Sequence, residues 1–356
     1  MANWKKKSIF AVDMKMRKIY YMLHSGKNSH LTYYLKNYLR QLIPASFYRL
    51  QLKRILKKLE RLSDKEQLLQ RVDYYCKLTP ESTIDRTLWE QSAVSTKDQP
   101  KLRKKMYYFD AMEIARYFDP AMRWVFKWGD IVDLQPVPSI LKSRPIGDNN
   151  QNSVLLKLVK VRHFLFVNDK KAWRDKRNIA VFRGDIGNEA AGDDKPNRRV
   201  FMNRWRNHPM IDAASTDCVE EHPEWQGEKM TIGEHLDYKF VMSLEGNDVA
   251  SNLKWIMSSN SIAVTPRLTC ETWFMEGTLI PNYHYIEVKE DFSDLEERLQ
   301  YYIDHPDEAE AIIQHAHEHV AKFCDKKRDG PQQTLFARAH AQSQTLQPWF
   351  CMARYR

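Results

Sequence analysis

Hydrophobic positions after residue 177 form short apolar runs that alternate with longer segments of helical spacing. The run NIAVF from Asn178 predicts a buried strand that opens into the polar loop RGDIGN. Other apolar runs predict strands, and two later segments with apolar residues every three or four positions predict helices. The predicted strands are Ala213–Ser215, Tyr238–Leu244, Ser261–Thr265 and Tyr285–Val288, and the predicted helices are Ser293–Tyr302 and Asp307–Phe323. This alternation predicts an α/β fold with a parallel sheet.

Residues 238–265 predict a strand, a polar turn, a helix and a second strand. The turn EGND is expected to end the first strand, and Asn247 or Asp248 to cap a helix over Val249–Ser258. A βαβ unit puts the helix N-terminus at the carboxyl edge of the sheet, where unpaired N–H groups favour a phosphate. Without GxGxxG or GxxxxGKS/T, an ordinary strand-turn-helix corner with a solvated lysine also fits. Side-chain donors for an anion stand at Ser251, Asn252 and Lys254.

The first half of the chain has helical and extended patterns. Residues 31–72 show helical spacing with charges between the apolar positions, which predicts two or three helices. Residues 106–118 repeat that pattern, whereas prolines 136, 138 and 145 prevent a helix over residues 126–146. Residues 153–166 alternate apolar and basic positions and predict a helix with Lys157, Lys160 and Arg162 on its outer side.

Length and composition indicate a folded protein with space for two domains. The 356 residues are 43% hydrophobic and 12% aromatic, and the five cysteines form no CxxC pair, which points to a reducing compartment. No run of 18 apolar residues predicts a transmembrane helix. The short apolar run after the first lysines ends at Asp13, so a signal peptide is not expected.

The net charge of +10 is concentrated in residues 1–60. These residues hold 14 Lys and Arg against Asp13 and Glu60, a net charge of +12, whereas the other 296 residues have a net charge of −2. Aromatic residues stand between the basic ones. This combination suits an anionic membrane surface or a nucleic acid strand, and equally a solvated basic helix face with an aromatic core side.

Five segments resemble sequence blocks of glycosyltransferase family 90. They are KSRPIGDNNQNSVLLKLVKVRHF, VFRGDIGN, SLEGNDVASNLKWIM, WF and PNYHYIEVKEDFSDL, between about Gly129 and Phe323. The family includes bacterial lipopolysaccharide core glycosyltransferases, fungal capsule xylosyltransferases and animal protein O-glucosyltransferases, and the bacterial branch is the most similar. The resemblance implies a GT-B-like fold, with two Rossmann-like domains that face a cleft.

The resemblance also implies a domain order. Residues 1–75 would form a basic helical N-terminal segment, and residues 76–177 an acceptor-side domain. Residues 178–325 would bind the nucleotide sugar, and residues 326–356 would pack back on the first domain.

The resemblance places the donor's diphosphate on basic and polar residues of both domains. Arg183 matches the arginine of the family's RG block, and without the resemblance an ion pair with Asp185 or Asp237 is favoured. Animal relatives carry an arginine at the position of Asn252, so Lys254 and the helix N-terminus would contribute more here. The implied diphosphate-binding residues are Arg183, Gly184, Ser251, Asn252, Lys254 and Arg144, the last with a salt bridge as its alternative role.

The general base and the nucleoside contacts are implied less directly. Inverting relatives use an aspartate upstream of the block aligned with SRP, which favours Asp133 by proximity, with Asp130 next; a solvated loop acid is the alternative for each. A carboxylate suits ribose and an aromatic face suits uracil, although core packing also explains the aromatic residues. The implied nucleoside-binding residues are Gly246, Asn247, Glu271 and Trp273.

The function implied is transfer of glucose or galactose, with inversion, from a UDP-sugar to a lipopolysaccharide core or lipid-linked acceptor. No DxD occurs, and the pair Asp193-Asp194 is a weak substitute, so we expect no metal and no cofactor. A lipid acceptor favours the anionic membrane over nucleic acid as partner of residues 1–60, at the cytoplasmic face of the bacterial inner membrane. The alternatives are a kinase of the same pathway, for which no HRD or DFG context occurs, and a non-catalytic polyanion-binding protein.

Overall fold

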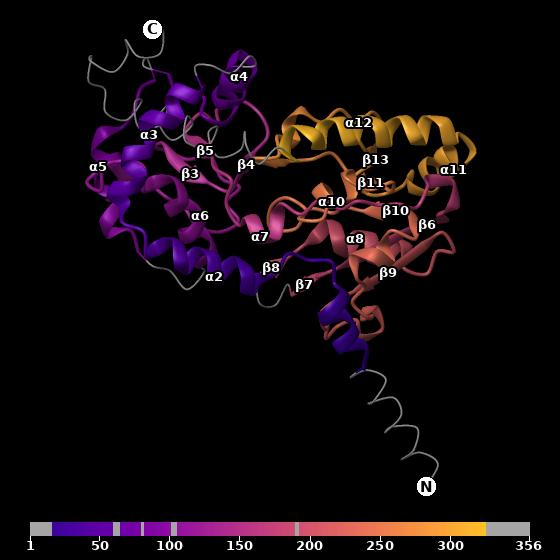
Figure 1. Cartoon of the computed structure of the whole chain (residues 1–356). Coiled ribbons are helices and arrows are strands. Elements are labelled where there is room, and N and C mark those ends of the chain that lie inside the picture. The colour runs from indigo at the N-terminus through magenta and orange to yellow at the C-terminus, as the bar shows by residue number, and fades with distance from the viewer. Residues whose placement is uncertain (1–15, 60–64, 80–81, 101–104, 189–191, 325–356) are drawn as a thin grey trace.

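Five parallel strands form the central sheet of the protein. The computed structural model describes residues 16–59, 65–79, 82–100, 105–188 and 192–324 (Figure 1), so the predicted tail over 326–356 lies outside the described residues. The strand order is β9-β6-β10-β11-β13. The bounds are β6 Arg177–Gly184, β9 Ile211–Ser215, β10 Tyr238–Met242, β11 Ile262–Thr265 and β13 Ile286–Glu287. The predicted α/β fold with a parallel sheet is confirmed.

Both faces of this sheet are buried, which explains its continuous apolar strands. Ala180 and Phe182 of β6 face one hydrophobic core with helices α8 and α11, whereas Val181 between them faces a second core with α10. The alternation follows from the period of two along a strand. Helix α12 contributes to both cores. The helices here are α8 Pro196–Trp205, α9 Ile232–His235, α10 Leu253–Met257, α11 Leu295–Asp304 and α12 Pro306–Cys324.

Before β6 the chain consists of helices and short strand pairs. A helix over residues 16–24 comes first, followed by α2 His30–Gln41, α3 Ala45–Leu59, α4 Lys65–Tyr75, α5 Arg86–Ser92, α6 Lys105–Ala115 and α7 Lys160–His163. Strands β1 Val94–Ser95 and β2 Arg123–Trp124 pair antiparallel, and β3 Ser139–Leu141 and β5 Ser153–Leu155 pair parallel. The described residues of this half contain no second five-stranded sheet, and the second Rossmann-like domain stays a prediction.

The helix predicted over residues 153–166 is wrong. Its first three residues form β5, which pairs with β3, and only Lys160–His163 are helical. Val159 between them has a φ of 53°, in the left-handed region that a continuous right-handed helix excludes. The sharp turn at Val159 separates the strand from the short helix.

The two halves meet at an antiparallel strand pair and share one hydrophobic core. Strand β4 Ser143–Pro145 pairs with β12 Cys270–Thr272, so that Arg144 lies opposite Glu271. The ring of Tyr75 stacks on Trp273 with centroids 3.7 Å apart, and its hydroxyl donates to the Trp273 carbonyl. One core runs from Leu68 in α4 to Phe323 in α12 and crosses the predicted boundary at residues 177/178.

Arg144 is completely buried at this strand pair, and its guanidinium holds several segments together. Its Nε donates to Glu271 Oε1 at 2.7 Å, and its two terminal nitrogens donate to the carbonyls of Ser153 and Tyr74 at 3.0 and 2.7 Å. The Tyr74 hydroxyl donates to the other oxygen of Glu271. All these partners belong to the interior of the chain itself, so Arg144 is fixed there and its guanidinium is not directed at a ligand.

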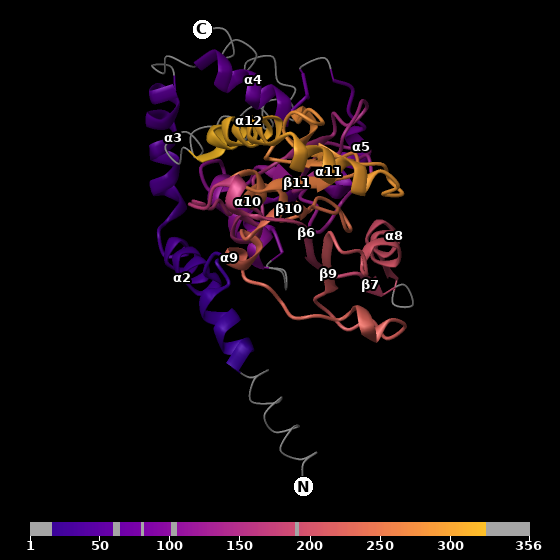
Figure 2. The ribbon, with the colours of Figure 1, turned by 90° about the vertical axis from the view of Figure 1, so that its right-hand side faces the viewer.

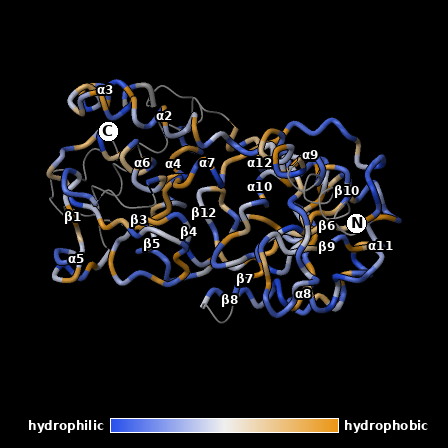
Figure 3. The backbone as a smooth tube through the Cα atoms, turned by 90° about the horizontal axis from the view of Figure 1, so that it is seen from below, coloured by the Kyte–Doolittle hydropathy of each residue, from blue (hydrophilic) through white to orange (hydrophobic). Residues whose placement is uncertain are grey.

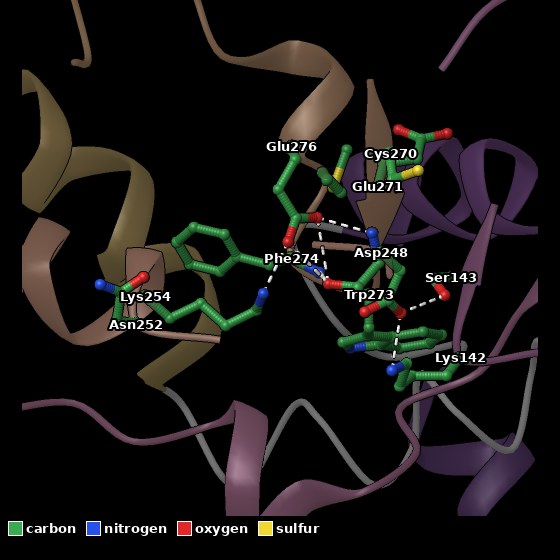
Figure 4. A network of polar contacts seen from close by, with 12 residues as sticks. Lys142, Ser143, Asp248, Asn252, Lys254, Cys270, Glu271, Trp273, Phe274 and Glu276 are labelled. Carbon is green, nitrogen blue, oxygen red and sulfur yellow. Dashed lines mark hydrogen bonds and ion pairs between the residues drawn. The ribbon is translucent and has the colours of Figure 1, made fainter. Parts of the chain in front are cut away.

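The helix of the βαβ unit is shorter than predicted. Helix α10 has five residues, and residues 247–252 form turns instead of its first part. Neither proposed cap, Asn247 or Asp248, stands next to the first residue of α10. The carboxylate of Asp248 instead accepts from Ser143 and Lys142, both at 2.6 Å (Figure 4). Asn252 donates to the Met242 carbonyl and accepts from Ser243. The predicted cap is therefore wrong, and a five-residue helix has little dipole to bind an anion.

Smaller elements complete the fold. They are the 3₁₀ turns η1 Thr96–Asp98, η2 Trp173–Asp175, η4 Pro223–Trp225 and η5 Glu276–Thr278 and the hairpin of β7 Gly187–Asn188 with β8 Asp193–Asp194. No helix among the described residues has the length and apolar content to cross a membrane.

We expect Arg144→Met to lower the free energy of unfolding by about 3–5 kcal/mol, because it leaves the Glu271 carboxylate buried without its counter-charge. Urea unfolding monitored by circular dichroism measures the loss. The double variant Arg144→Met/Glu271→Leu should recover most of it, since no buried charge remains. Arg174→Met is the matched control, because Arg174 is 55% exposed and should leave the unfolding midpoint almost unchanged. Equal midpoints for Arg144→Met and the control would contradict the structural role.

Candidate functional site

The strand order of the sheet places a crevice between the ends of β6 and β10. If the five strands are numbered by their order in the sequence, their order across the sheet is 2-1-3-4-5. The connections that leave β6 and β10 therefore turn to opposite sides. Ligands of open α/β sheets bind at such a switch point, outside the carboxyl ends of the strands. A cavity of about 410 Å³ lies there, lined by Arg183 and Gly184 from the end of β6 and by Gly246 and Asn247 after β10. We call it the sheet-end chamber.

Charged side chains of the sheet-end chamber are mostly paired with one another. Lys195 donates to Asp185 at 2.8 Å and to Asp193 at 2.6 Å. Two further carboxylates of the lining, Asp130 and Asp248, share the ammonium of buried Lys142 at 2.5 and 2.6 Å. Burial raises the pKa of Asp248 even though Lys142 opposes the shift. The chamber thus offers hydrogen-bond acceptors whose charge is largely compensated.

Two arginines of the lining have no carboxylate partner among the described residues. Arg198 donates to the main-chain carbonyls of Asp185 and Leu244 at 2.6 and 2.8 Å. A Cβ on Gly246 would lie 3.0 Å from its guanidinium, so glycine leaves the space that Arg198 occupies. Arg162 is exposed, and its guanidinium makes no hydrogen bond or ion pair within the part of the chain that the structure describes. With Arg183 and Lys195 they give the lining four basic side chains, which match in number its four carboxylates.

Arg183 is held at the end of β6 by Asp212 of β9. One terminal nitrogen donates to Asp212 Oδ1 at 2.6 Å, and the other to the carbonyls of Phe182 and Asp212. Burial alone would raise the pKa of Asp212, but hydrogen bonds from Tyr238 and Arg183 bring it below the ordinary value. Nε of Arg183 is buried without a hydrogen-bond partner among the described residues. Arg183 is thus a fixed cation with one unsatisfied N–H group.

A second cavity, of about 460 Å³, adjoins the first, and we call it the side chamber. Its walls come from the helix at residues 16–24 and the loop after it, from α7, and from residues 229–235. Aromatic and aliphatic side chains such as Tyr21, Met230 and Trp255 line it, together with Lys27 and Lys229, and no Asp or Glu belongs to its lining. It combines apolar walls with positive charge.

The two chambers share one wall, formed by Arg162, Arg183, Thr216, Ser251 and Asn252. The N-terminal segment closes the side chamber through fixed contacts. Arg17 forms an ion pair with Glu234 at 2.7 Å, and Asn28 donates to the Val161 carbonyl at 3.1 Å. The two chambers are therefore adjacent, and we call them together the cleft.

The structure brings seven of the twelve residues proposed from the sequence into the sheet-end chamber. They are Asp130, Arg183, Gly184, Gly246, Asn247, Ser251 and Asn252. The ion pair expected for Arg183 as an alternative exists, but with Asp212 instead of Asp185 or Asp237.

The other five residues lie outside both chambers. Lys254 is completely buried and ion-paired with Glu276 at 2.6 Å, so its ammonium does not reach the cleft (Figure 4). Glu271 binds Arg144 in the interior. Trp273 is stacked on Tyr75, which confirms the alternative that this aromatic residue packs in the core. Asp133 is exposed on a loop and lines neither chamber.

Several residues of the cleft were not proposed from the sequence. Lys195 and Arg198 stand just before and in the first turn of α8, a helix that the sequence analysis did not predict. Their position after the first strand of a parallel sheet was the available indication, because that loop lies at the switch point. Arg162 stands in the segment wrongly predicted as one long helix. The remaining unpredicted lining residues of the sheet-end chamber are Phe182, Asp185, Asp193, Thr216, Leu244, Asp248 and Val249.

Metal ligands do not gather in the described residues: no group of three or more His, Cys, Asp or Glu side chains has a metal-binding arrangement there. Asp193 accepts from Lys195, so an ammonium stands beside this carboxylate. The independence from metal stays a prediction.

A parallel α/β sheet with a cavity outside the carboxyl ends of its strands, at the switch point, is the arrangement by which open α/β proteins bind ligands. Residues 154–328 match the sequence profile of the family described as glycosyl transferase family 90. O-glucosyltransferase LpsA of Dichelobacter nodosus is 38% identical over 226 residues, which are 63% of this chain and 69% of that protein. Uncharacterized protein 027R of Frog virus 3 (isolate Goorha) is 28% identical over 169 residues, 40% of this chain and 17% of that protein. The chain belongs to glycosyl transferase family 90.

We expect Asp212→Asn to lower the free energy of unfolding at pH 7 and to lose this effect in acid. The folded-state pKa of Asp212 lies below its unfolded value, so the ionised carboxylate stabilises the fold above pH about 3.9, and this contribution disappears as pH falls through the folded pKa. Urea unfolding of both proteins between pH 7 and pH 3 measures the difference. Asp217→Asn is the control, because Asp217 is exposed and its ion pair with Lys229 is 3.7 Å long. A difference that does not change with pH would contradict the assignment.

Proposed function

We propose that this glycosyltransferase moves a hexose from a UDP-sugar to a sugar acceptor, with inversion and without a metal ion. The observation that carries the proposal is the division of the cleft: two chambers of different chemistry meet at a wall with two arginines. A nucleotide sugar has the same three parts, a planar base with ribose, a diphosphate and a hydroxyl-rich sugar. The GT-B-like arrangement belongs to this proposal, with the N-terminal half as the side of the cleft that faces the sheet.

The diphosphate would bind at the shared wall. Guanidinium groups chelate phosphate oxygens, and the guanidinium of Arg162 has no partner among the described residues. Arg183 would bind through the part of its side chain that lines both chambers, since its unpartnered Nε–H is buried. Ser251 and Thr216 add hydroxyl groups to the same wall. Positive charge at this place stabilises the negative charge that develops on the departing UDP, which is the task of a metal in other transferases. No cofactor is part of this proposal.

The nucleoside would occupy the side chamber, whose apolar walls suit a base and whose lining has no carboxylate to repel phosphate. This replaces the nucleoside contacts first proposed at Glu271 and Trp273, which lie in the interior. Gly246 and Asn247 line the sheet-end chamber and would contact the sugar instead. Carboxylates accept hydrogen bonds from sugar hydroxyls, so the acceptor-rich sheet-end chamber suits the hexose.

Asp130 is our choice for the general base, because it lines the sheet-end chamber and Asp133 does not. The acceptor hydroxyl attacks the anomeric carbon from the side opposite the diphosphate, and the carboxylate accepts its proton. The bond from the anomeric carbon to UDP breaks as the new C–O bond forms, so one displacement inverts the configuration. Lys142 holds Asp130 Oδ1 at 2.5 Å and fixes the position of the carboxylate.

The relative from Dichelobacter nodosus, whose name specifies O-glucosyl transfer, supports glucose over galactose as the sugar. We take the acceptor to be a sugar of the lipopolysaccharide core or a lipid-linked oligosaccharide. The corresponding place of action is the cytoplasmic face of the bacterial inner membrane, where UDP-sugars and such acceptors meet.

Calorimetric titration with UDP, ADP and GDP in EDTA tests the donor site. We expect selective binding of UDP that Arg183→Ala weakens by about 10- to 100-fold, because a charge-assisted hydrogen bond contributes about 1.5–3 kcal/mol. Arg174→Ala, a change of an arginine outside both chambers, should bind UDP like the wild type. Absence of UDP binding would refute the donor site, and binding that requires magnesium or manganese would refute the metal-free mechanism.

Asp130→Asn should lower kcat by about 10²–10⁴-fold, the usual contribution of a general base, while the affinity for UDP stays within a few-fold. Asp133→Asn is the matched control, since it removes an exposed carboxylate three residues away. Steady-state transfer from UDP-glucose to the deacylated core oligosaccharide measures both variants. The reverse pattern, with Asp133→Asn inactive and Asp130→Asn active, would return the role of base to Asp133.

A further inference from the structure

Helix α2 presents its polar side to the protein and its leucines to the surroundings. On the inner side, the Tyr33 hydroxyl donates to Asp110 at 2.8 Å, and Arg40 forms an ion pair with Glu113 at 2.7 Å. On the outer side, Leu31, Leu35 and Leu42 are 79%, 59% and 78% exposed. A helix on the surface of a soluble domain normally has the opposite orientation. The contacts of α2 with α6 thus combine these polar pairs with the rings of Tyr34 and Tyr38 against Phe109, while the three leucines stay exposed.

The neighbouring helices continue this surface. Of the 21 exposed large hydrophobic side chains among the described residues, 13 lie between Met16 and Leu50, and we call these 13 the apolar face. Figure 2 shows the helix at residues 16–24, α2 and α3 following one another along one edge of the molecule, and in Figure 3 hydrophobic and hydrophilic positions alternate along α3. The most exposed members are Met16, Met22, Leu23, Leu31, Leu42 and Leu50. Exposed apolar surface of this extent marks an interaction site.

The same segment has positive charge without any negative charge. No Asp or Glu occurs between Asp13 and Glu60. Lys18, Lys36 and Arg54 are exposed beside the apolar residues. Clusters of Lys and Arg next to inserted apolar side chains are the features by which proteins bind anionic lipid headgroups.

We propose that the apolar face docks on an anionic lipid bilayer, with the three helices lying in the plane of the membrane surface. Most of the exposed residues are Leu, Ile and Met, which gain free energy in acyl chains but not from stacking on nucleic acid bases. A second copy of this chain would bring two acid-free basic surfaces together, which opposes self-association. The bilayer is therefore the partner that fits both the apolar and the charged residues.

Docking through this face places the cleft next to the membrane. Tyr21, Lys27, Asn28 and His30 of the same segment line the side chamber. The segment is fixed to the sheet half through Arg17 and Glu234, so the orientation of the docked segment sets that of the cleft. This consequence rests on the proposed function, because docking next to the membrane serves the reaction only where the acceptor is attached to a lipid.

Flotation of the full chain with vesicles tests the proposal. We expect binding to vesicles of phosphatidylcholine with about one third phosphatidylglycerol, and at least tenfold weaker binding to phosphatidylcholine alone. The variant Leu31→Ser/Leu35→Ser/Leu42→Ser should lose binding at least tenfold, and Lys18→Gln/Lys36→Gln should lose much of the preference for anionic vesicles. The control Leu69→Ser/Val200→Ser/Ile280→Ser changes three exposed apolar residues elsewhere and should bind like the wild type.

Equal vesicle binding by the two triple variants would overturn the proposal. So would a wild type that ignores vesicles but binds single-stranded RNA, or one whose apolar face is covered in a dimer detected by analytical ultracentrifugation. UDP titration of each variant separates the two proposals: lost vesicle binding with intact UDP binding refutes only the docking face. Lost UDP binding in the wild type with intact vesicle binding refutes only the proposed donor site.

Discussion

The buried ion pair between Arg144 and Glu271 is the contact on which the cleft depends. It lies at the β4–β12 strand pair, where the helical half meets the sheet half, and both side chains are almost completely removed from water. A second buried pair, Lys142 with Asp248, joins the same halves close to the sheet-end chamber. Buried charges tolerate little displacement from their partners, so these pairs fix the two halves in one arrangement. That arrangement brings Arg162 of one half to Arg183 of the other.

Burial separates the structural cations of this protein from those that can serve a ligand. Arg144 and Lys254 are completely buried and matched one to one with glutamates, so an incoming phosphate would have to break an ion pair to reach them. Arg183 is also paired, with Asp212, and its unsatisfied Nε–H is buried, but its side chain lines both chambers, and Arg162 is exposed. All four are basic residues near strand or helix ends in the sequence. Only the folded structure distinguishes a charge used for stability from one available for binding.

Local pattern was sufficient for the sheet and for the residues at its strand ends. Strands β6 and β10 are apolar on both faces, which made them recognisable. Arg183 and Gly184 are the last two residues of β6, so the prediction of this strand also placed them at the edge of the sheet. The short α10 was not predictable, because Asp248 and Asn252 are held by residues from β4 and β10. Glu271 and Trp273 were misplaced for a similar reason. Their partners Arg144 and Tyr75 stand 127 and 198 positions earlier in the chain, beyond the reach of any local pattern.

The orientation of α2 also follows from contacts that the sequence does not display. Burial raises the pKa of Asp110 to about 6, although the amide of Lys160 and the hydroxyl of Tyr33 favour its charged form. Burial also acts on Glu113, but Lys160 and Arg40 overcome it and lower that pKa to about 2. These two carboxylates, together with the ring of Phe109 against Tyr34 and Tyr38, hold the inner side of α2, which leaves its leucines on the outer side. Because the acids belong to α6, a helical wheel of α2 alone would assign the leucines to the core, and the apolar face exists only in the folded chain.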